Sequence, residues 1–315
     1  MYKRQTKPHS YKGRTIKPSG DQYAIAFQPL KDFDFVQKTK FGFLVLIGKI
    51  NKQPYSGIVH NFQTTTEPHS YLVRGFVVHN CGSKTPHFIK TYGFEGLHGR
   101  ALPVATAAKL VNPELNVVVV SGDGDNYGIG GNHFIHSMRR NLNITLIVQN
   151  NEVYGLTKGQ YSPTSEKGFK SPSTPNGGLE EPVNPIKLAL AMGATYVARG
   201  YAFDIVHLKK LIVEGIKHKG FSIIDVFQPC STYNKVNTMV WYKQHLYKLE
   251  ESGHDPSNIQ EAWIKADEWG DKIPTGLFFR TQKPTYEDGM PQLALPPVKH
   301  DISNVDIEPL LARFR

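Results

Sequence analysis

The sequence predicts an α/β fold, in which a parallel sheet carries helices on both faces, preceded by a shorter all-β segment. Downstream of residue 81, apolar runs typical of buried strands alternate with amphipathic stretches of helical period. Upstream of residue 80, short β-type runs are separated by turns rich in Gly, Pro, Asn and Lys, without helical periodicity. We therefore expect an all-β part over 1–80, an α/β domain over 81–270, and a Pro-rich tail over 271–315 that packs on the surface.

The expected elements follow from these runs in order. The upstream β-type runs are YAIAF, FGFLVLIG, SGIVHNF and SYLVRGFVV. Downstream, strands are expected at 115–122, 143–151, 194–200 and 221–229, helices at 130–141, 185–193 and 204–218, and a long loop at 155–180.

Composition excludes several classes of protein. The chain has 315 residues, 39% of them hydrophobic and 20% charged, which is typical of a globular protein and not of a disordered one. Two cysteines exclude a disulfide framework and fit a reducing compartment, so we expect a cytoplasmic location. The apolar run at 41–50 is shorter than the ~20 residues that cross a bilayer, and we expect no membrane association. The net charge of +10 fits an acidic partner as well as it fits nucleic acid.

A paired motif follows two neighbouring strands. Gly122-Asp123-Gly124 ends one predicted strand, and Asn150-Asn151 ends the next along the chain. That spacing leaves room for one helix and a returning strand, so both ends meet at the carboxyl edge of the sheet, where open α/β folds bind ligands. Carboxylate and amide oxygens suit Mg²⁺, and glycines with a helix N-terminus suit a diphosphate.

This pair resembles the motif that binds thiamine diphosphate in the diphosphate-binding (PP-type) domain of thiamine enzymes. The resemblance implies that Asp123, Asn151 and the backbone carbonyl of Val153 bind Mg²⁺. It also implies a set of residues around the diphosphate: Gly122, Gly124, Asp125, Gly155, Leu156, Thr157 and Lys158. For Lys158 and Lys84, contact with the diphosphate or a substrate carboxylate competes with a solvated loop position. His98, Arg100 and His133 are candidate active-site residues or helix-start and packing residues.

A longer set of segments points to one family. LHGRALPVATAAKLVNPEL, GDGDNYGIGGNHFIHSMRRN, YGLTKGQYSPTS, EPVNPIKLALAMGATYVARG and DVFQPCSTYN together resemble the β subunit of archaeal and bacterial 2-oxoacid:ferredoxin oxidoreductases. The resemblance implies oxidative decarboxylation of a 2-oxo acid to an acyl-CoA, with coenzyme A as co-substrate and ferredoxin as electron acceptor. It also implies a partner α subunit, so that this chain alone should be inactive.

The same family carries one [4Fe–4S] cluster on four cysteines. Cys81, ahead of Lys84-Thr85-Pro86-His87, and Cys230, within Gln228-Pro229-Cys230, match two of those positions. Two thiolates do not hold a four-iron cluster in the usual way, so this chain alone should lack it. The family commonly has Cys-Ser-Gly-Lys where this chain has Cys-Gly-Ser-Lys, which leaves the geometry of that loop open.

The boundary at residue 80 has a chemistry of its own. VHNFQTTTEPHSY at 59–71 and RGFVVHNC at 74–81 resemble the last two motifs of an intein, whose Hint-type fold is all-β. Asn80 would cyclise and cleave the bond after it, His79 would polarise that peptide, and Cys81 would accept the upstream polypeptide. His69 matches the family's second histidine, whereas Asn61 stands where many inteins have Asp. We expect the upstream intein and extein half to be missing, so that only cleavage after Asn80 remains.

Two other functions stay open. One is a thiamine diphosphate-dependent decarboxylase or synthase without an iron–sulfur cluster, which would need no cysteine at position 230. The other is an intein-associated DNA-binding protein, suggested by the basic residues of 1–90. That stretch contains no paired acidic helix motif for a nuclease metal, and the sequence does not distinguish pyruvate, 2-oxoglutarate and branched 2-oxo acids.

Overall fold

The chain forms two compact units, Met1–Asn61 and Phe62–Arg315. The computed structural model describes residues 91–301 and 306–314, positions 85 and 89, and eight short strands upstream of residue 80. In the first unit, β1 (Tyr2–Arg4) pairs with β4 (Gln22–Ala24), β2 (His9–Tyr11) with β3 (Arg14–Ile16), and β5 (Val36–Thr39) with β6 (Gly42–Val45), all antiparallel. In the second unit, β7 (Tyr71–Val73) pairs with β8 (Phe76–Val78). An all-β segment over the whole of 1–80 stays a prediction.

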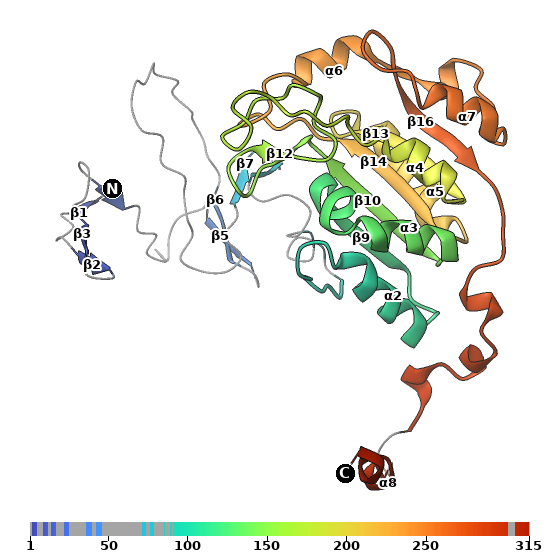
Figure 1. The fold of residues 1–315 in the computed structure, drawn as a ribbon. Coiled ribbons are helices and arrows are strands. Elements are labelled where there is room, and N and C mark those ends of the chain that lie inside the picture. The colour runs from blue at the N-terminus through green and yellow to red at the C-terminus, as the bar shows by residue number, and fades with distance from the viewer. Residues whose placement is uncertain are drawn as a thin grey trace. The chain divides into compact units, whose positions relative to one another are not determined.

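The second unit contains a six-stranded sheet in the order β15-β16-β13-β14-β10-β9 (Figure 1). Four of its strands are parallel: β9 (Val117–Gly122), β10 (Ile144–Asn150), β13 (Tyr196–Tyr201) and β14 (Ser222–Phe227). β16 (Ile273–Arg280) runs antiparallel to β13, and β15 (Leu246–Lys248) runs parallel to β16. The predicted parallel sheet is therefore correct for four strands and wrong at one edge.

The same strand corrects the predicted surface tail. Residues 273–279 are all buried, Ile273 and Phe278 completely. The Pro-rich composition of 271–315 as a whole concealed an apolar run, IPTGLFF, which the hydrophobic effect draws into the sheet. Described residues beyond this strand form the short turns expected of a Pro-rich segment, at Glu287–Gly289, Pro291–Ala294 and Pro297–Lys299.

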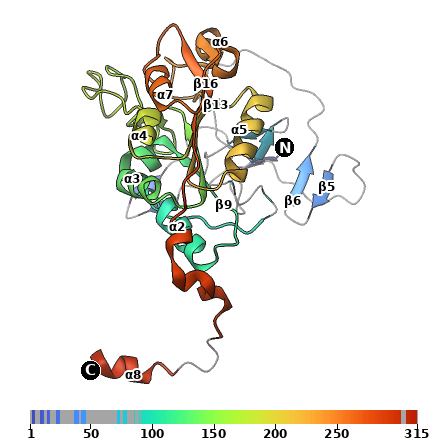
Figure 2. The same ribbon diagram turned by 90° about the vertical axis from the view of Figure 1, so that its right-hand side faces the viewer.

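Helices cover both faces of the sheet, as predicted (Figure 2). One face packs against α2 (Ala101–Val111), α3 (Gly131–Arg140), α4 (Pro185–Ala191) and α7 (Ile259–Lys265). The other face packs against α5 (Ile205–Lys217). Because successive strand residues point to opposite faces, Ile223 and Ile224 of β14 enter these two separate cores.

The helix boundaries follow from local chemistry. The side-chain oxygen of Asn184 accepts a hydrogen bond from the Lys187 amide ahead of α4, and Pro185 occupies the first turn. Asp204 caps α5 in the same way through the His207 amide.

Further elements are a π-helix at Gly124–Ile129, the short pair β11 (Val153–Tyr154) and β12 (Gln160–Tyr161), α6 (Met239–His245), a 3₁₀ turn at Leu249–Glu251, α8 (Glu308–Leu311) and a final turn at Ala312–Phe314. Within the described part of the chain, no helix has the length and apolar character to cross a bilayer.

Candidate functional site at the carboxyl edge of the sheet

Strand register brings the two predicted motifs to one edge. Gly122 at the end of β9 lies level with Gln149 of β10, and Asn150 at the end of β10 lies level with Phe227 of β14. Asp123 and the residues after Asn150 therefore leave the sheet side by side. The predicted meeting of the motifs at the carboxyl edge is confirmed.

Asp123 is an enclosed acidic group at this edge, with only 2% of its surface exposed. Ser162 and Thr164 donate hydrogen bonds to its Oδ2 atom at 2.7 and 2.8 Å. Burial raises the pKa of Asp123, although these hydroxyls and the backbone N–H groups of Asp123 and Asn151 favour its ionised form. The hydrogen bond from the Asn151 amide shows that Asp123 and Asn151 are neighbours in space.

Asn151 and Val153 form a tight turn next to Asp123. Both are buried, and the Asn151 side-chain oxygen accepts the Val153 amide at 3.2 Å. Glu152 between them has a positive φ of 57°, a left-handed conformation that is uncommon for a residue with a side chain. Such conformations occur mainly where the surrounding structure demands them, and functional sites are typical places.

The donor set fits a hard divalent cation. Asp123 offers a carboxylate, Asn151 an amide oxygen and Val153 a carbonyl, which are the ligand types that Mg²⁺ takes up together with water and phosphate oxygens. No three His, Cys, Asp or Glu side chains of the described residues converge as a metal site. A metal here would therefore depend on amide, carbonyl and ligand oxygens beside the one carboxylate.

Gly124 has a packing role. A Cβ atom at this position would collide with the ring of Tyr154, whose hydroxyl donates to the Gly124 carbonyl at 3.1 Å. Gly122 has no comparable restriction, because the nearest atom to an added Cβ is the Gln149 oxygen at 3.9 Å. The need for glycine at 124 thus comes from the aromatic ring above it.

Asp125 holds the loop that precedes α2. Its Oδ1 atom accepts the Gly99 amide and lies 3.1 Å from His98 Nδ1. Gly99 adopts φ +75°, and a side chain there would collide with Ile129, so only glycine suits the turn. Arg100 is exposed and donates to the Gly99 carbonyl at 3.2 Å. The structure thereby brings His98 and Arg100 to the π-helix that follows Asp123.

The loop after β11 is open to solvent. Gly155 is half-buried, Leu156, Thr157 and Lys158 are exposed, and the Thr157 hydroxyl donates to Gln160 Oε1. Lys158 has a φ of 81°, the most positive value of any described residue other than glycine. These side chains are accessible to a ligand, and their contact with a diphosphate stays a prediction.

Cys230 lies beside this loop. It follows β14 at the same edge, is half-buried, and accepts the Tyr233 amide at its Sγ atom, 3.4 Å away. The Tyr233 ring packs directly on Gly159, and Asn234 Nδ2 donates to the Asn151 carbonyl at 3.4 Å. The segment that carries Cys230 is therefore packed against, and hydrogen-bonded to, the segment that carries Asn151.

Five of the predicted site residues lie outside the described residues. They are His69, His79, Asn80 and Cys81 of the proposed junction, together with Lys84. Their predicted roles stay predictions.

The sequence did not reveal a buried polar network behind Asp123. Thr164 also donates to the Asn150 side chain at 2.9 Å, and Asn150 donates to Asp225 at 3.2 Å. Tyr127 donates to the same carboxylate at 2.9 Å, and Arg199 forms an ion pair with it at 3.5 Å. A lone acid in the apolar strand SIIDVF was the available signal, but its partners follow only from the register that sets Arg199 opposite Asp225.

Glu152 was also missed. It is 1% exposed, Tyr242 donates to its Oε1 atom at 2.7 Å, and its buried Oε2 atom has no partner among the described residues. Burial raises the pKa of Glu152 to about 8, with the Tyr242 hydrogen bond acting in the opposite direction. In the sequence, Glu152 is one residue of an ordinary NNEVYG stretch.

Two known protein families match consecutive parts of this chain. The family described as "Thiamine pyrophosphate enzyme, C-terminal TPP binding domain" matches residues 75–226, and the family of the C-terminal part of the pyruvate ferredoxin oxidoreductase beta subunit matches residues 230–294. The chain is similar to 2-oxoacid:ferredoxin oxidoreductase 1, subunit beta, of Aeropyrum pernix, with 46% identity over 73% of this chain and 78% of that protein. It is likewise similar to the beta subunit of Saccharolobus solfataricus, with 45% identity over 73% and 81%.

A solved structure agrees. The 2-oxoglutarate:ferredoxin oxidoreductase of Magnetococcus marinus, determined with 2-oxoglutarate, coenzyme A and succinyl-CoA bound, matches with a TM-score of 0.65 and 38% identity. The match covers 74% of this chain and 79% of that one.

Proposed function

Because the chain belongs to the β subunits of 2-oxoacid:ferredoxin oxidoreductases, we propose that it supplies the magnesium and diphosphate half of an active site shared with an α subunit. The reaction is the oxidative decarboxylation of a 2-oxo acid to an acyl-CoA, with ferredoxin as electron acceptor. The observation that carries this proposal is the pairing of buried Asp123 with Asn151 at the carboxyl edge of the sheet.

Asp123, Asn151 and the Val153 carbonyl are the proposed Mg²⁺ ligands. Ser162 and Thr164 hold the Asp123 carboxylate through Oδ2, so its direction is set before any metal binds. A divalent cation would also offset the cost of a carboxylate that is only 2% exposed, because burial disfavours its ionised form. When bound, thiamine diphosphate supplies the electron sink that decarboxylation requires.

The proposed diphosphate contacts come from the loop at Gly155–Lys158 and from the segment at Gly122–Asp125. Backbone amides at these positions can donate to phosphate oxygens, and the Lys158 ammonium can neutralise their charge. His98 and Arg100 stand beside the π-helix, where they can orient a ligand that lies across this edge. Their half-exposed and exposed side chains are accessible from solvent.

We further propose that Cys230 and Cys81 contribute two thiolates to a [4Fe–4S] cluster. Support comes from the position of Cys230, whose loop packs on Gly159 and binds the Asn151 carbonyl through Asn234. A cluster held there would lie next to the thiamine site, and electrons would travel a short path between them. The other two ligands must come from outside this chain's two cysteines.

Co-expression of the chain with its α subunit tests this function. We expect 2-oxo acid- and coenzyme A-dependent reduction of ferredoxin, and a decrease of about 10- to 100-fold for Asp123→Asn. Asp271→Asn is the matched control, because it removes an exposed carboxyl group. Isothermal titration calorimetry should show that Asp123→Asn binds Mg²⁺ and thiamine diphosphate more weakly than Asp271→Asn does. Equal binding by both variants would refute the assignment of the metal site.

For residues upstream of Cys81 we propose the C-terminal part of an intein, with cleavage after Asn80. The motifs at 59–71 and 74–81 support it. Mass spectrometry of the purified protein provides the test. A product that begins at Cys81 and is lost in Asn80→Ala supports the proposal, and an intact chain at all pH values contradicts it.

A further inference from the structure

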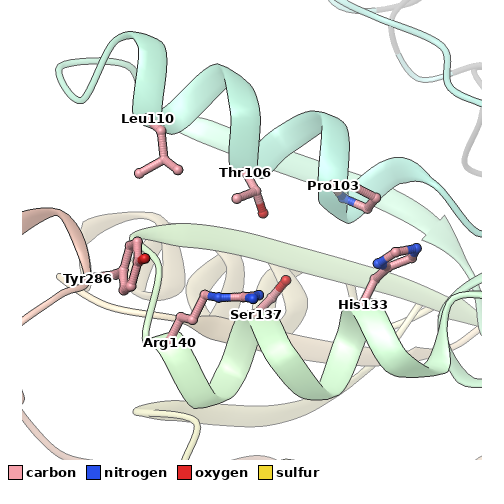
Figure 3. A pocket seen from close by; sticks show the side chains of 7 residues that line it. All are labelled: Pro103, Thr106, Leu110, His133, Ser137, Arg140 and Tyr286. Atoms are coloured by element: carbon pink, nitrogen blue, oxygen red, sulfur yellow. The ribbon is translucent and has the colours of Figure 1, made fainter.

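A pocket opens between α2 and α3, away from the carboxyl-edge residues described above. Its volume is about 310 Å³, and Figure 3 shows side chains entering it from both helices. The lining residues are Pro103, Thr106 and Leu110 of α2, His133, Ser137 and Arg140 of α3, and Tyr286 from the C-terminal segment. None of the proposed Mg²⁺ ligands is among them.

Helix periodicity produces one polar wall of this pocket. His133, Ser137 and Arg140 are spaced at i, i+4 and i+7, so they share one face of α3. In Figure 3 they face α2 across the gap. One wall of the pocket therefore consists of three hydrogen-bonding side chains of different length on a single helix.

These donors have no partners within the described residues. Arg140 and His133 form no ion pair or hydrogen bond there, and neither does the Ser137 hydroxyl, although Ser137 is only 3% exposed. Arg139, the next residue on the helix, instead donates through Nε to His136. The Ser137 hydroxyl lines the pocket and can therefore donate a hydrogen bond to a ligand there.

The charge around the pocket favours an anion. Glu287, which follows Tyr286, is engaged by the Asn143 amide at 3.0 Å and is not a lining residue. The hydroxyl of Thr106 donates to the Leu102 carbonyl at 2.8 Å. Of the lining residues, Arg140 carries a permanent positive charge and none carries a carboxylate. Pro103, Leu110 and Tyr286 add an apolar and aromatic rim.

We propose that this pocket binds the phosphate group of a small phosphorylated molecule. The guanidinium fork of Arg140 matches two phosphate oxygens, and Ser137 and His133 can donate to the remaining ones. The volume is near the lower limit of small-molecule sites, so it accommodates a phosphate with a short organic group against Leu110 and Tyr286. The pocket contains none of the proposed Mg²⁺ ligands, although His133 also lines a small cavity with Gly99 and Asp125.

Titration of the full chain with inorganic phosphate, followed by ³¹P NMR at constant ionic strength, tests this site. We expect saturable binding that Arg140→Gln weakens by about tenfold, the factor that corresponds to 1.4 kcal/mol. Arg139→Gln, with the same change of charge one residue away, should bind like the unmodified chain. Ser137→Ala should weaken binding without altering the far-UV circular dichroism.

A second arm identifies the source of the phosphate. Coenzyme A and 3′-dephospho-coenzyme A are titrated in parallel, since the proposed function makes coenzyme A available. Tighter binding of coenzyme A that requires Arg140 assigns the site to the 3′-phosphate of the co-substrate. Equal binding of both compounds, which share the diphosphate, shows that the 3′-phosphate is not recognised and assigns the pocket to another phosphate group. Non-saturable binding, equal loss in Arg139→Gln and Arg140→Gln, or loss of phosphate binding when the α subunit is present would overturn the proposal.

Discussion

Glu152 is buried and Glu250 is partly exposed, and their pKa values move in opposite directions. Burial raises the pKa of Glu152 to about 8, and among the described residues only Tyr242 donates a hydrogen bond to it. Burial also acts upward on Glu250, but hydrogen bonds from His207 and from the amides of Glu250 and Leu277 lower its pKa to about 2. Exposure and hydrogen-bond donors together therefore set the pKa of each carboxyl group.

The same contrast separates two regions of the second unit. The carboxyl edge gathers Asp123, Glu152 and Asp225, and burial raises the pKa of each. Near α5 and β16, Glu250 accepts hydrogen bonds from His207 and from backbone amides. His207 Nε2 lies 3.3 Å from Glu250 Oε2. Carboxyl groups gathered in a buried region reduce stability, and such a cost is typical of sites that bind a cation.

The largest effect should come from breaking the buried pair at the carboxyl edge. Asp225→Asn leaves the Arg199 guanidinium without its counterion, and the Nε and Nη1 atoms of Arg199 have no hydrogen-bond partner in the part of the chain that the structure describes. Stacking on Phe227 and Phe278, 4.9 and 5.3 Å from the ring centroids, does not replace a carboxylate. We expect a loss of about 3–5 kcal/mol in the free energy of unfolding.

Urea unfolding measures this loss. All three tryptophans, Trp241, Trp263 and Trp269, lie in the second unit, so their fluorescence reports its unfolding. Adding Arg199→Met to Asp225→Asn should restore about half of the loss or more, because the unpaired charge is gone. Asp267→Asn, which breaks the exposed pair with Lys187, serves as the control and should cost about 0–1 kcal/mol. A cost below about 1 kcal/mol for Asp225→Asn would contradict a stabilising ion pair.

Glu250→Gln should have a smaller effect that depends on pH. The folded pKa of about 2 lies below the unfolded value of 4.5, so the unfolded chain binds more protons between these limits. The stabilisation is complete above pH 4.5 and disappears as pH falls towards 2. Because the side chain is 36% exposed, solvent screening reduces the contribution to about 1–2 kcal/mol.

Unfolding of the unmodified chain and Glu250→Gln is compared at pH 7, 4.5 and 3. The difference should be largest at pH 7 and shrink at pH 3. Glu251→Gln alters the exposed neighbour on the same turn and should change stability little at any of these values. A difference between Glu250→Gln and the unmodified chain that grows on acidification would show that donors do not hold Glu250 in its ionised form.

The sequence predicted the framework of the carboxyl edge because that framework depends on local patterns. Strands were expected at 115–122 and 143–151, and the structure has them at Val117–Gly122 and Ile144–Asn150. Continuous apolar runs make such buried strands recognisable. The strand at Ile273–Arg280 was missed because average composition, dominated by later prolines, outweighed its short apolar run.

The network around Asp123 could not be predicted in the same way. Ser162 and Thr164 lie about 40 residues downstream in a long loop, and nothing local links them to Asp123. Arg199 and Asp225 meet only through the register of β13 and β14. Long-range contacts of this kind depend on the packed fold as a whole.

The smallest effect concerns backbone strain at the carboxyl edge. Lys158 holds a φ of 81°, which glycine adopts freely and a residue with a Cβ adopts at a cost of about 1–2 kcal/mol. Lys158→Gly should therefore stabilise the chain by about 0.5–1 kcal/mol after the greater entropy of unfolded glycine is subtracted. Lys158→Gln removes the charge and keeps the strain, so it separates the two properties. We expect Lys158→Gly to unfold at higher urea than Lys158→Gln, while both variants weaken thiamine diphosphate binding equally because both lack the ammonium group. Identical unfolding midpoints would mean that the loop relaxes this strain. The carboxyl edge and the α5–β16 side would then differ in the state of their carboxyl groups and not in backbone strain.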